Sequence, residues 1–256
     1  MNIDVLGLDG KKIKSIELPV QFSEHYEPDL VNRAVLTVFG NSRQAYGTMP
    51  YAGQTYSGKL SRRRRDYKGA YGKGISRVPR KTMWRRGAQF GWVGTIAPGT
   101  RGGRRAHPSK ATKIWALKIN VKERRKAIRS ALSGVYTTSK LVVVDNNFEH
   151  LKSVKDLTPV LKSLGFETTS VKRVRAGRGK SRGRAVRYKK NPLVVVAQSC
   201  EVTQALSNIP GYDTIDIKSL NAHLLSLGYG VPRTCIFTEG ALAILTKEKL
   251  FLKGDS

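Results

Sequence analysis

Leu141-Val142-Val143-Val144 is a short run of apolar, mostly β-branched residues that ends at Asp145. Two further runs of this kind occur later in the chain, Leu193-Val194-Val195-Val196-Ala197 and Cys235-Ile236-Phe237. Strands that are apolar at every position are buried on both faces, which is typical of a parallel sheet covered by helices. The three runs therefore predict the centre of an α/β fold.

Segments with helical periodicity precede and separate these runs. Pro28 to Arg43 predicts a helix with proline in its first turn, and Asn120 and Glu123 predict the start of another. In chain order the remaining expected elements are a helix capped by Thr158 and Pro159 that ends at Gly165, a helix after Cys200, a strand from Asp213 to Ile217, a helix from Leu220 to Leu227, and a helix that begins at Thr238. A hairpin turning at Asp9-Gly10 is expected between Asn2 and Leu18. This alternation predicts an open, mostly parallel sheet with helices on both faces.

Charge is distributed very unevenly along the 256 residues. The chain has 47 Lys and Arg against 18 Asp and Glu, a formal net charge of +29. Residues 41–112 hold 17 of the basic residues and a single acid, Asp66, and residues 172–190 hold 10 basic residues and no acid. The rest of the chain is almost neutral. We therefore expect one globular domain from residues 1–43 and 112–256, interrupted by basic loops at 44–111 and 172–191.

The longer loop has the composition of a segment that needs a partner to become ordered. It lacks apolar periodicity and, over residues 41–112, holds 12 of the 25 glycines. A surface that needs only solubility mixes both signs of charge, which these segments do not. A structureless stretch of this length is either functional or disordered until it binds. A polyanion that neutralises the charge is the expected partner, and nucleic acid is the commonest one.

Aromatic residues alternate with cations in this loop, a pattern that suits RNA. Rings can stack on unpaired bases while arginine pairs with phosphates. The stacking candidates are Tyr51, Tyr56, Tyr67, Trp84 and Trp92. For Phe90 and Trp92, a small apolar cluster is an equal alternative. Because no groove-reading helix or zinc finger can be assembled here, RNA is favoured over duplex DNA.

Other partners and compartments fit less well. The run Arg62-Arg63-Arg64-Arg65 could be a nuclear targeting signal, but basic character continues for another 40 residues. No apolar run approaches the roughly 20 residues that span a bilayer, and the N-terminus does not resemble a signal peptide. Two unpaired cysteines, Cys200 and Cys235, argue against a disulfide framework or metal cluster and suit a reducing cytoplasm.

Motifs for enzymatic chemistry are weak. Gly179-Lys180-Ser181 ends like a phosphate-binding loop, but Val174 stands where that motif needs glycine. A carboxylate at a strand end such as Asp145 can be catalytic in this class of fold, although Asn146 and Asn147 favour a turn or cap. With Asp66 as its single acid, the basic loop could hardly hold two metal ions. We expect no catalytic residue, metal or cofactor.

Specific strings resemble the universal large-subunit ribosomal protein four family in its archaeal and eukaryotic-type form. In chain order they are Tyr51-Ala52-Gly53, Arg85-Arg86-Gly87-Ala88-Gln89-Phe90, Gly91-Trp92-Val93-Gly94, Ala97 to Pro108, Lys118 to Ala131, Ala176 to Arg184, Ser219-Leu220-Asn221 and Phe237 to Leu242. They span essentially the whole chain in the family's order. The chain ends at Ser256 without the long extension of eukaryotic relatives, which favours an archaeal form.

The resemblance implies a structural constituent of the large ribosomal subunit that binds 23S-type rRNA early in assembly. It implies an α/β body at the subunit surface, beside neighbouring ribosomal proteins. The long loop would reach the peptide exit tunnel, with its tip near the nascent peptide and between Gly72 and Gln89. The cytoplasm is the expected location, and no membrane contact is expected.

The cations of both loops are the expected rRNA-binding residues. They are Arg62, Arg63, Arg64, Arg65, Arg77, Arg80, Lys81, Arg85, Arg86, Arg101, Arg104, Arg105, His107, Arg178, Lys180, Arg182 and Arg184. Two alternatives remain open beside the ribosomal hypothesis. One is an RNA-processing enzyme that uses the α/β body, and the other is a free-standing regulator or chaperone of RNA.

Overall fold

The computed structural model describes residues 1–168, 171–228 and 230–252. Its contacts divide the chain into two units, which we call the α/β body and the basic unit. The α/β body comprises Met1–Asn41 and Ala116–Ser256, and the basic unit comprises Ser42–Trp115.

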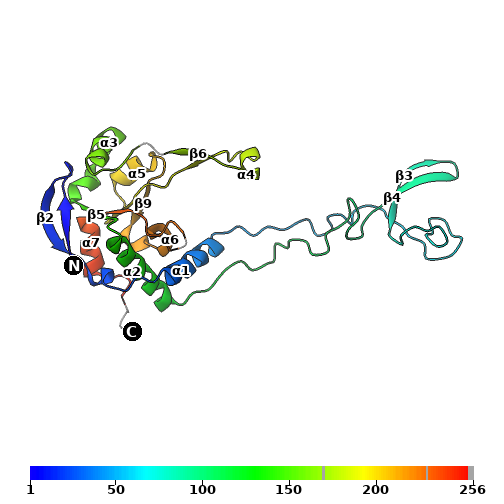
Figure 1. Ribbon diagram of the computed structural model, residues 1–256, viewed down its shortest axis with the longest axis horizontal. Helices are drawn as coiled ribbons and strands as arrows, with labels where there is room; N and C mark the ends of the chain where they lie inside the picture. The colour runs from blue at the N-terminus through cyan, green and yellow to red at the C-terminus, as the bar shows by residue number, and fades with distance from the viewer. Residues whose placement is uncertain (169–170, 229, 253–256) are drawn as a thin grey trace. The chain divides into compact units, whose positions relative to one another are not determined.

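The body is built on a six-stranded sheet (Figure 1). Its strands are β1 (Asn2–Leu6), β2 (Lys12–Glu17), β5 (Leu141–Val144), β8 (Leu193–Val196), β9 (Asp213–Asp216) and β10 (Cys235–Thr238). They lie in the order β2-β1-β5-β10-β8-β9, with β2 antiparallel to β1 and every other pair parallel. The predicted mostly parallel sheet and the N-terminal hairpin are therefore confirmed.

Helices connect these strands. They are α1 (Pro28–Asn41), α2 (Val121–Thr137), α3 (Val154–Ser163), α5 (Glu201–Ser207), α6 (Ala222–Leu225) and α7 (Glu239–Lys247), with the 3₁₀ turns η1 (Val20–Phe22), η2 (Asn146–His150) and η3 (Ile217–Ser219). The predicted start of α7 is confirmed, because the Thr238 hydroxyl accepts a hydrogen bond from the backbone N–H of Ala241.

Alternate residues of the central strands face two separate cores. Val143, Val195 and Phe237 pack against α1, α2, α6 and α7. Val144 and Ile236 point the other way and pack against α3 and α5. Because side chains of a strand alternate between faces, an all-apolar strand needs a helical layer on each side. The predicted helices on both faces are confirmed.

The predicted boundaries of three helices, α1, α3 and α6, were wrong. Helix α3 begins four residues before Thr158, since Ser153 caps it by accepting a hydrogen bond from Lys155 N at 3.2 Å. Thr158 and Pro159 lie inside the helix. This start places Leu157 and Leu161, both fully buried, on the face that covers the sheet.

The expected helix from Leu220 to Leu227 is reduced to the four residues of α6. Ser226 instead forms a β-bridge with Pro232, and Leu227 N donates to Val231 O at 2.9 Å. Because the backbone at Ser226 and Leu227 is paired with Pro232 and Val231 in this tight turn, it cannot continue the helix. Helix α1 also ends two residues before the predicted Arg43.

The basic unit contains one regular hairpin, where no regular structure was expected. Strand β3 (Arg80–Arg86) pairs antiparallel with β4 (Gln89–Gly94). The turn between them uses Gly87 at φ 56°, a conformation that glycine adopts readily. The prediction from composition was therefore wrong for this part of the loop, because a high content of glycine and basic residues does not record the cross-strand pairs of a short hairpin.

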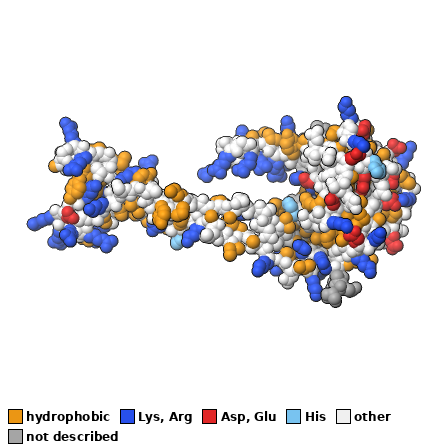
Figure 2. All heavy atoms as spheres, turned by 180° about the vertical axis from the view of Figure 1, so that it is seen from behind, with side chains coloured by type: hydrophobic (Ala, Val, Ile, Leu, Met, Phe, Trp, Pro, Cys, Tyr) orange, Lys and Arg blue, Asp and Glu red, His pale blue; other side chains and the backbone are white. Residues whose placement is uncertain are grey.

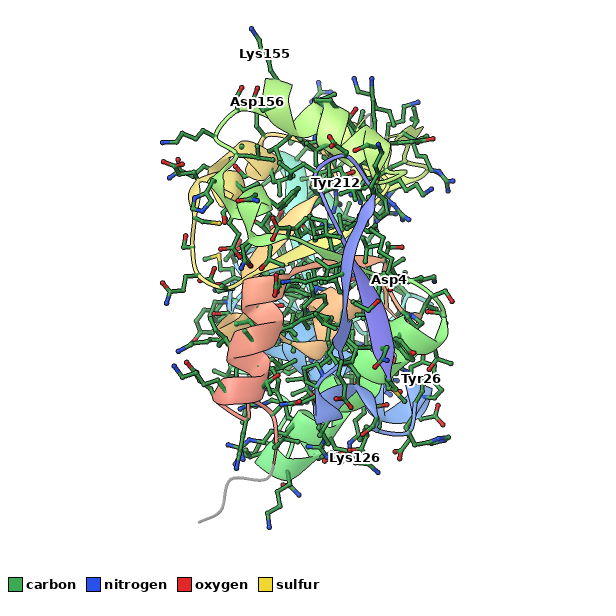
Figure 3. All side chains as sticks on the ribbon, turned by 90° about the vertical axis from the view of Figure 1, so that its left-hand side faces the viewer. Asp4, Tyr26, Lys126, Lys155, Asp156 and Tyr212 are labelled. Carbon is green, nitrogen blue, oxygen red and sulfur yellow. The ribbon has the colours of Figure 1, made fainter. Side chains whose placement is uncertain are left out.

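Lys126 and Tyr212 lie toward opposite ends of the body, and each makes a polar contact (Figure 3). At one end Lys126 Nζ binds Glu27 Oε1 at 2.7 Å, and this hydrogen bond raises the pKa of Lys126. At the other end Tyr212 Oη donates to Glu167 O at 3.0 Å. Burial of that phenol raises its pKa to about 12. Among the described helices, none is long and apolar enough to cross a membrane.

Candidate nucleic-acid interface

Lys and Arg side chains gather in two places, on the basic unit and along a hairpin of the body (Figure 2). That hairpin consists of β6 (Lys172–Val174), α4 (Arg178–Ser181) and β7 (Val186–Tyr188). Elsewhere the body carries both signs of charge, and several of its lysines and arginines pair with carboxylates, such as Lys126 with Glu27 and Arg129 with Glu24.

Asp66 organises the turn that presents the arginine run Arg62–Arg65. Its carboxylate accepts hydrogen bonds from the Ser61 hydroxyl and from Tyr67 N, the latter at 2.7 Å. Its carbonyl accepts from Gly69 N at 3.0 Å. The Ser61 hydrogen bond, followed by that of Tyr67 N–H, lowers the pKa of Asp66. The one acid of this unit therefore has a structural use, and all four arginines are exposed.

Three aromatic rings of the basic unit contact one another. Tyr67 lies 5.1 Å from Phe90, and Phe90 lies 5.3 Å from Trp92 in an edge-to-face arrangement, measured between ring centroids. Phe90 and Trp92 are half-buried, in keeping with the apolar-cluster alternative. Tyr67 remains 53% exposed, so one member of this cluster still offers a free ring surface.

Several cations of the unit sit over aromatic rings. Lys81 Nζ lies 3.9 Å from the centroid of Tyr56, and Arg77 Cζ lies 4.5 Å from that of Tyr71. A cation held over a ring is attracted by the negative face of the π system. These pairs keep cations and stacking surfaces together, which suits a polymer that alternates bases with phosphates.

Arg80 differs from the other predicted phosphate ligands because it is 9% exposed. It donates to Ser76 Oγ at 3.1 Å and to Val78 O at 3.4 Å, and its guanidinium lies 4.9 Å from the Trp92 centroid. Its side chain therefore holds the base of the β3–β4 hairpin in place. Such a residue supports the neighbouring cations and is poorly placed to contact RNA itself.

Trp84 lies across the hairpin over Gly91, its partner in β4. A Cβ atom at Gly91 would collide with the indole ring. The glycine therefore leaves room for the indole ring, while 55% of the tryptophan stays exposed. Trp84 thus presents an aromatic surface to solvent.

The remaining predicted residues of the basic unit are at its surface. Lys81 and Arg104 are partly buried. The exposed ones are Arg77, Arg85, Arg86, Arg101, Arg105, His107, Tyr51 and Tyr56.

The β6–β7 hairpin presents its cations differently. Arg178, Lys180, Arg182 and Arg184 lie in or just after α4, and all are exposed. Arg184 N donates to Gly179 O at 3.0 Å, which closes this end of the hairpin. Gly179-Lys180-Ser181 thus lies in a single helical turn between antiparallel strands. A phosphate-binding loop instead joins a strand to a full helix.

Sequence reasoning missed cations on the strands of this hairpin. Arg173, Arg175 and Arg187 line a pocket of about 500 Å³ together with Gly179. The sequence feature that could have identified these three arginines is the excess of basic residues over 172–190. The cross-strand pairing of Arg173 with Arg187 could not be inferred from it.

Open α/β folds bind ligands at the carboxyl edge of the sheet. In this body, side chains that follow β5 occupy that edge. Glu149 Oε1 accepts from Thr238 Oγ1 at 2.6 Å and from Ala197 N at 3.0 Å. Asn146 Oδ1 accepts from Gly240 N at 2.6 Å, and Asp145 is bound by Asn147. Within the described residues, no three His, Cys, Asp or Glu side chains lie together as metal ligands would.

Comparison with known proteins agrees with this arrangement. Residues 16–248 match the model of the ribosomal protein L4/L1 family. The chain is 39% identical to the large ribosomal subunit protein uL4 of Nanoarchaeum equitans, over 98% of this chain and 100% of that protein. It is 37% identical to the protein of that name from Archaeoglobus fulgidus, over 96% and 98% of the two chains, and 35% identical to that from Methanocaldococcus jannaschii, over 94% and 97%.

The body has a mostly parallel sheet, and its carboxyl edge is occupied by its own side chains. The similarity to these proteins covers nearly the full length of the chain. The chain belongs to the ribosomal protein L4/L1 family.

Proposed function

We propose that this chain is a structural constituent of the large ribosomal subunit that binds 23S-type rRNA through two basic arms, residues 44–111 and 172–191. One observation carries the proposal. The two arms hold nearly all of the net charge of +29, and their cations are exposed, apart from Arg80 and the partly buried Lys68, Lys81 and Arg104. Lysines and arginines that replace counterions around folded RNA need this exposure.

Different residue types of the arms would contact phosphates and bases. The exposed arginines of the arginine run, the β3–β4 hairpin and α4 would pair with phosphates in bidentate geometry. Tyr51, Tyr56, Tyr67 and Trp84 would stack on unpaired bases, since each is at least 47% exposed. Arg80 and Trp92 would support them from within the basic unit.

The family membership extends this proposal to the position of the long arm. Residues 44–111 would form an extended arm that enters the rRNA early in assembly and reaches the peptide exit tunnel. Its tip, between Gly72 and Gln89, would lie near the nascent peptide. Gly72, Gly74 and Gly87 would accept a close neighbour, because open space surrounds each of them. Neighbouring large-subunit proteins would contact the body.

Salt dependence tests the electrostatic basis of binding. The affinity of the full chain for 23S-type rRNA should fall linearly on a log–log plot against salt, with a slope of about 0.7 to 0.9 for each phosphate neutralised. A filter-binding titration over a range of salt concentrations measures this slope. An affinity that does not respond to salt would contradict RNA binding through the arms.

Sedimentation tests the ribosomal assignment. The chain should travel with large subunits through a sucrose gradient at moderate salt, and should crosslink to their rRNA from Arg62 to Arg105. Co-sedimentation with small subunits, or a predominantly ribosome-free pool, would contradict the proposal.

A further inference from the structure

A pocket of about 430 Å³ lies within the basic unit, between two segments that run side by side. Thr48 N of the first segment donates to Ser109 O of the second at 3.0 Å. Within the second segment, Lys113 N donates to Lys110 O at 3.2 Å and forms a turn. Gly47 packs so closely on the backbone of residues 110–111 that a Cβ would collide. These backbone contacts build the walls. The lining residues are Tyr46, His107, Pro108, Ser109, Lys110, Thr112, Lys113 and Trp115.

Trp115, which lines this pocket, carries an unpaired hydrogen-bond donor. Its indole Nε1 is buried and donates to no acceptor in the described part of the chain. Buried donors are nearly always paired, so an unpaired one points to a missing acceptor. The acceptor could be a base carbonyl, a ring nitrogen or a phosphate oxygen, since indole N–H donates to each.

One ring and two cations lie close to the indole ring of Trp115. Tyr46 and Trp115 are nearly parallel, at 17°, with centroids 6.2 Å apart. Arg43 Cζ lies 3.7 Å and Lys113 Nζ 4.2 Å from the Trp115 centroid. Tyr46 remains 54% exposed, which leaves surface for a further planar group. The lining includes no carboxylate that would repel a phosphate.

We propose that this pocket holds one unstacked nucleotide of the bound RNA. Its base stacks on Tyr46 and accepts a hydrogen bond from Trp115 Nε1, and its phosphate lies beside Lys110 and Lys113. The volume falls within the range of small-ligand sites, roughly 300 to 1,000 Å³. This inference rests on the proposed RNA binding and assigns one nucleotide-sized contact within it.

Single-ring substitutions in the full-length protein test the pocket. Trp115→Phe keeps an aromatic ring and removes the N–H, while Tyr46→Leu removes the stacking surface. Each should weaken binding to 23S-type rRNA by about 5- to 10-fold, the scale of one lost stack or hydrogen bond. Ile114→Ala is the control, because Ile114 neighbours Trp115 in the chain, is 85% exposed and does not line the pocket, so affinity should stay unchanged.

Nucleotide-resolution chemical probing shows where the loss occurs. Both pocket variants should expose the same one nucleotide and retain the rest of the wild-type footprint. Wild-type affinity and protection in Trp115→Phe would overturn the proposal. A footprint weakened uniformly would also overturn it, because the rings would then act only by supporting the unit.

A lysine variant provides an independent measurement that leaves the rings in place. Lys110→Gln should reduce the slope of log affinity against log salt concentration by about one. An unchanged slope would show that no phosphate lies beside Lys110. If the wild-type chain itself showed no salt-dependent binding, the proposed function would fail. If the wild type binds and the pocket variants bind equally well, the pocket proposal alone fails.

Discussion

Glu149 connects three strands at the carboxyl edge of the sheet. It follows β5 in the chain, and its Oε1 accepts hydrogen bonds from Thr238 at the end of β10 and from Ala197 just after β8. No local pattern distinguishes Glu149 from a surface glutamate. Its role depends on the pairing of strands that lie far apart in the sequence.

Replacing Glu149 should therefore destabilise the body. Glu149→Ala leaves the Thr238 hydroxyl and the Ala197 N–H without their acceptor, which should lower the free energy of unfolding by about 1 to 3 kcal/mol. Urea denaturation followed by circular dichroism measures this. Glu201→Ala is the control, since Glu201 pairs with Lys152 on the exposed surface and should change stability by about 0.5 kcal/mol or less. Equal effects of the two variants would refute the connecting role of Glu149.

Arg233 and Asp213 form the other strongly constrained polar pair of the body. The Arg233 residue is 3% exposed, and it binds Asp213 Oδ2 at 2.6 Å and Asn191 O at 2.8 Å. Burial of Asp213 would raise its pKa, but hydrogen bonds from Lys190 and Arg233 outweigh burial and lower it below the ordinary value of 3.8. Ionised Asp213 is therefore favoured by folding.

Acid should remove this contribution. A carboxyl with a depressed folded pKa stabilises the protein fully above its unfolded pKa, and loses that effect as pH falls through the folded pKa. Asp213→Asn should lower the free energy of unfolding by about 1 to 3 kcal/mol at neutral pH. The gap from wild type should shrink below pH 3.8. Urea unfolding at neutral and acidic pH tests this, and an equal gap at both would count against it.

At the scale of the element, α3 contains a proline that the rest of the helix tolerates. Pro159 is exposed and lies at the sixth position of α3, Val154–Ser163. There its ring opposes the carbonyl of Lys155 and its nitrogen cannot donate to it. Ser153 and the buried Leu157 and Leu161 fix the helix regardless. A local reading of Thr-Pro as a helix start failed because tertiary burial decided the boundary.

Pro159→Ala should stabilise α3. The variant restores one backbone hydrogen bond and relieves the ring contact, partly offset by greater freedom of the unfolded chain. We expect a gain of about 1 kcal/mol, visible as a higher thermal midpoint. Pro28→Ala is the matched control, since Pro28 opens α1 where no hydrogen bond is missing. A loss of stability in Pro159→Ala would show that the proline is needed.

At the scale of the whole molecule, the body has a core of its own. All buried members of its two apolar clusters lie within residues 5–35 and 127–245, outside the basic unit. The two chain ends at which the basic unit is inserted are adjacent, because Leu117 N donates to Asn41 Oδ1 at 3.0 Å. The body can therefore be closed without the insert.

Excision of the basic unit tests this separation. Replacing Ser42–Trp115 by a short Gly/Ser linker should leave the urea midpoint of the body nearly unchanged, because closing a short loop is entropically cheap. RNA affinity should fall at least about tenfold through the lost cations. A body that no longer unfolds cooperatively would show that the basic unit contributes to its stability.

The sequence alone predicted the central strands of the body, the approximate positions of its helices and the segregation of charge. All-apolar, β-branched runs such as 141–144 and 193–196 favour central strands, and the excess of Lys and Arg over acids favours a polyanionic partner, so both predictions need only local composition.

The tertiary structure decided what composition and local patterns do not record. Strand order and the meeting of Tyr46 with Trp115 depend on residues far apart in the sequence. The β3–β4 hairpin and the burial of Arg80 depend on packing across neighbouring strands. Trp115 lies just beyond the predicted loop 44–111, and its unpaired N–H appears only once the two segments pair. Such contacts arise from non-local packing free energy, which no local pattern of residue types records.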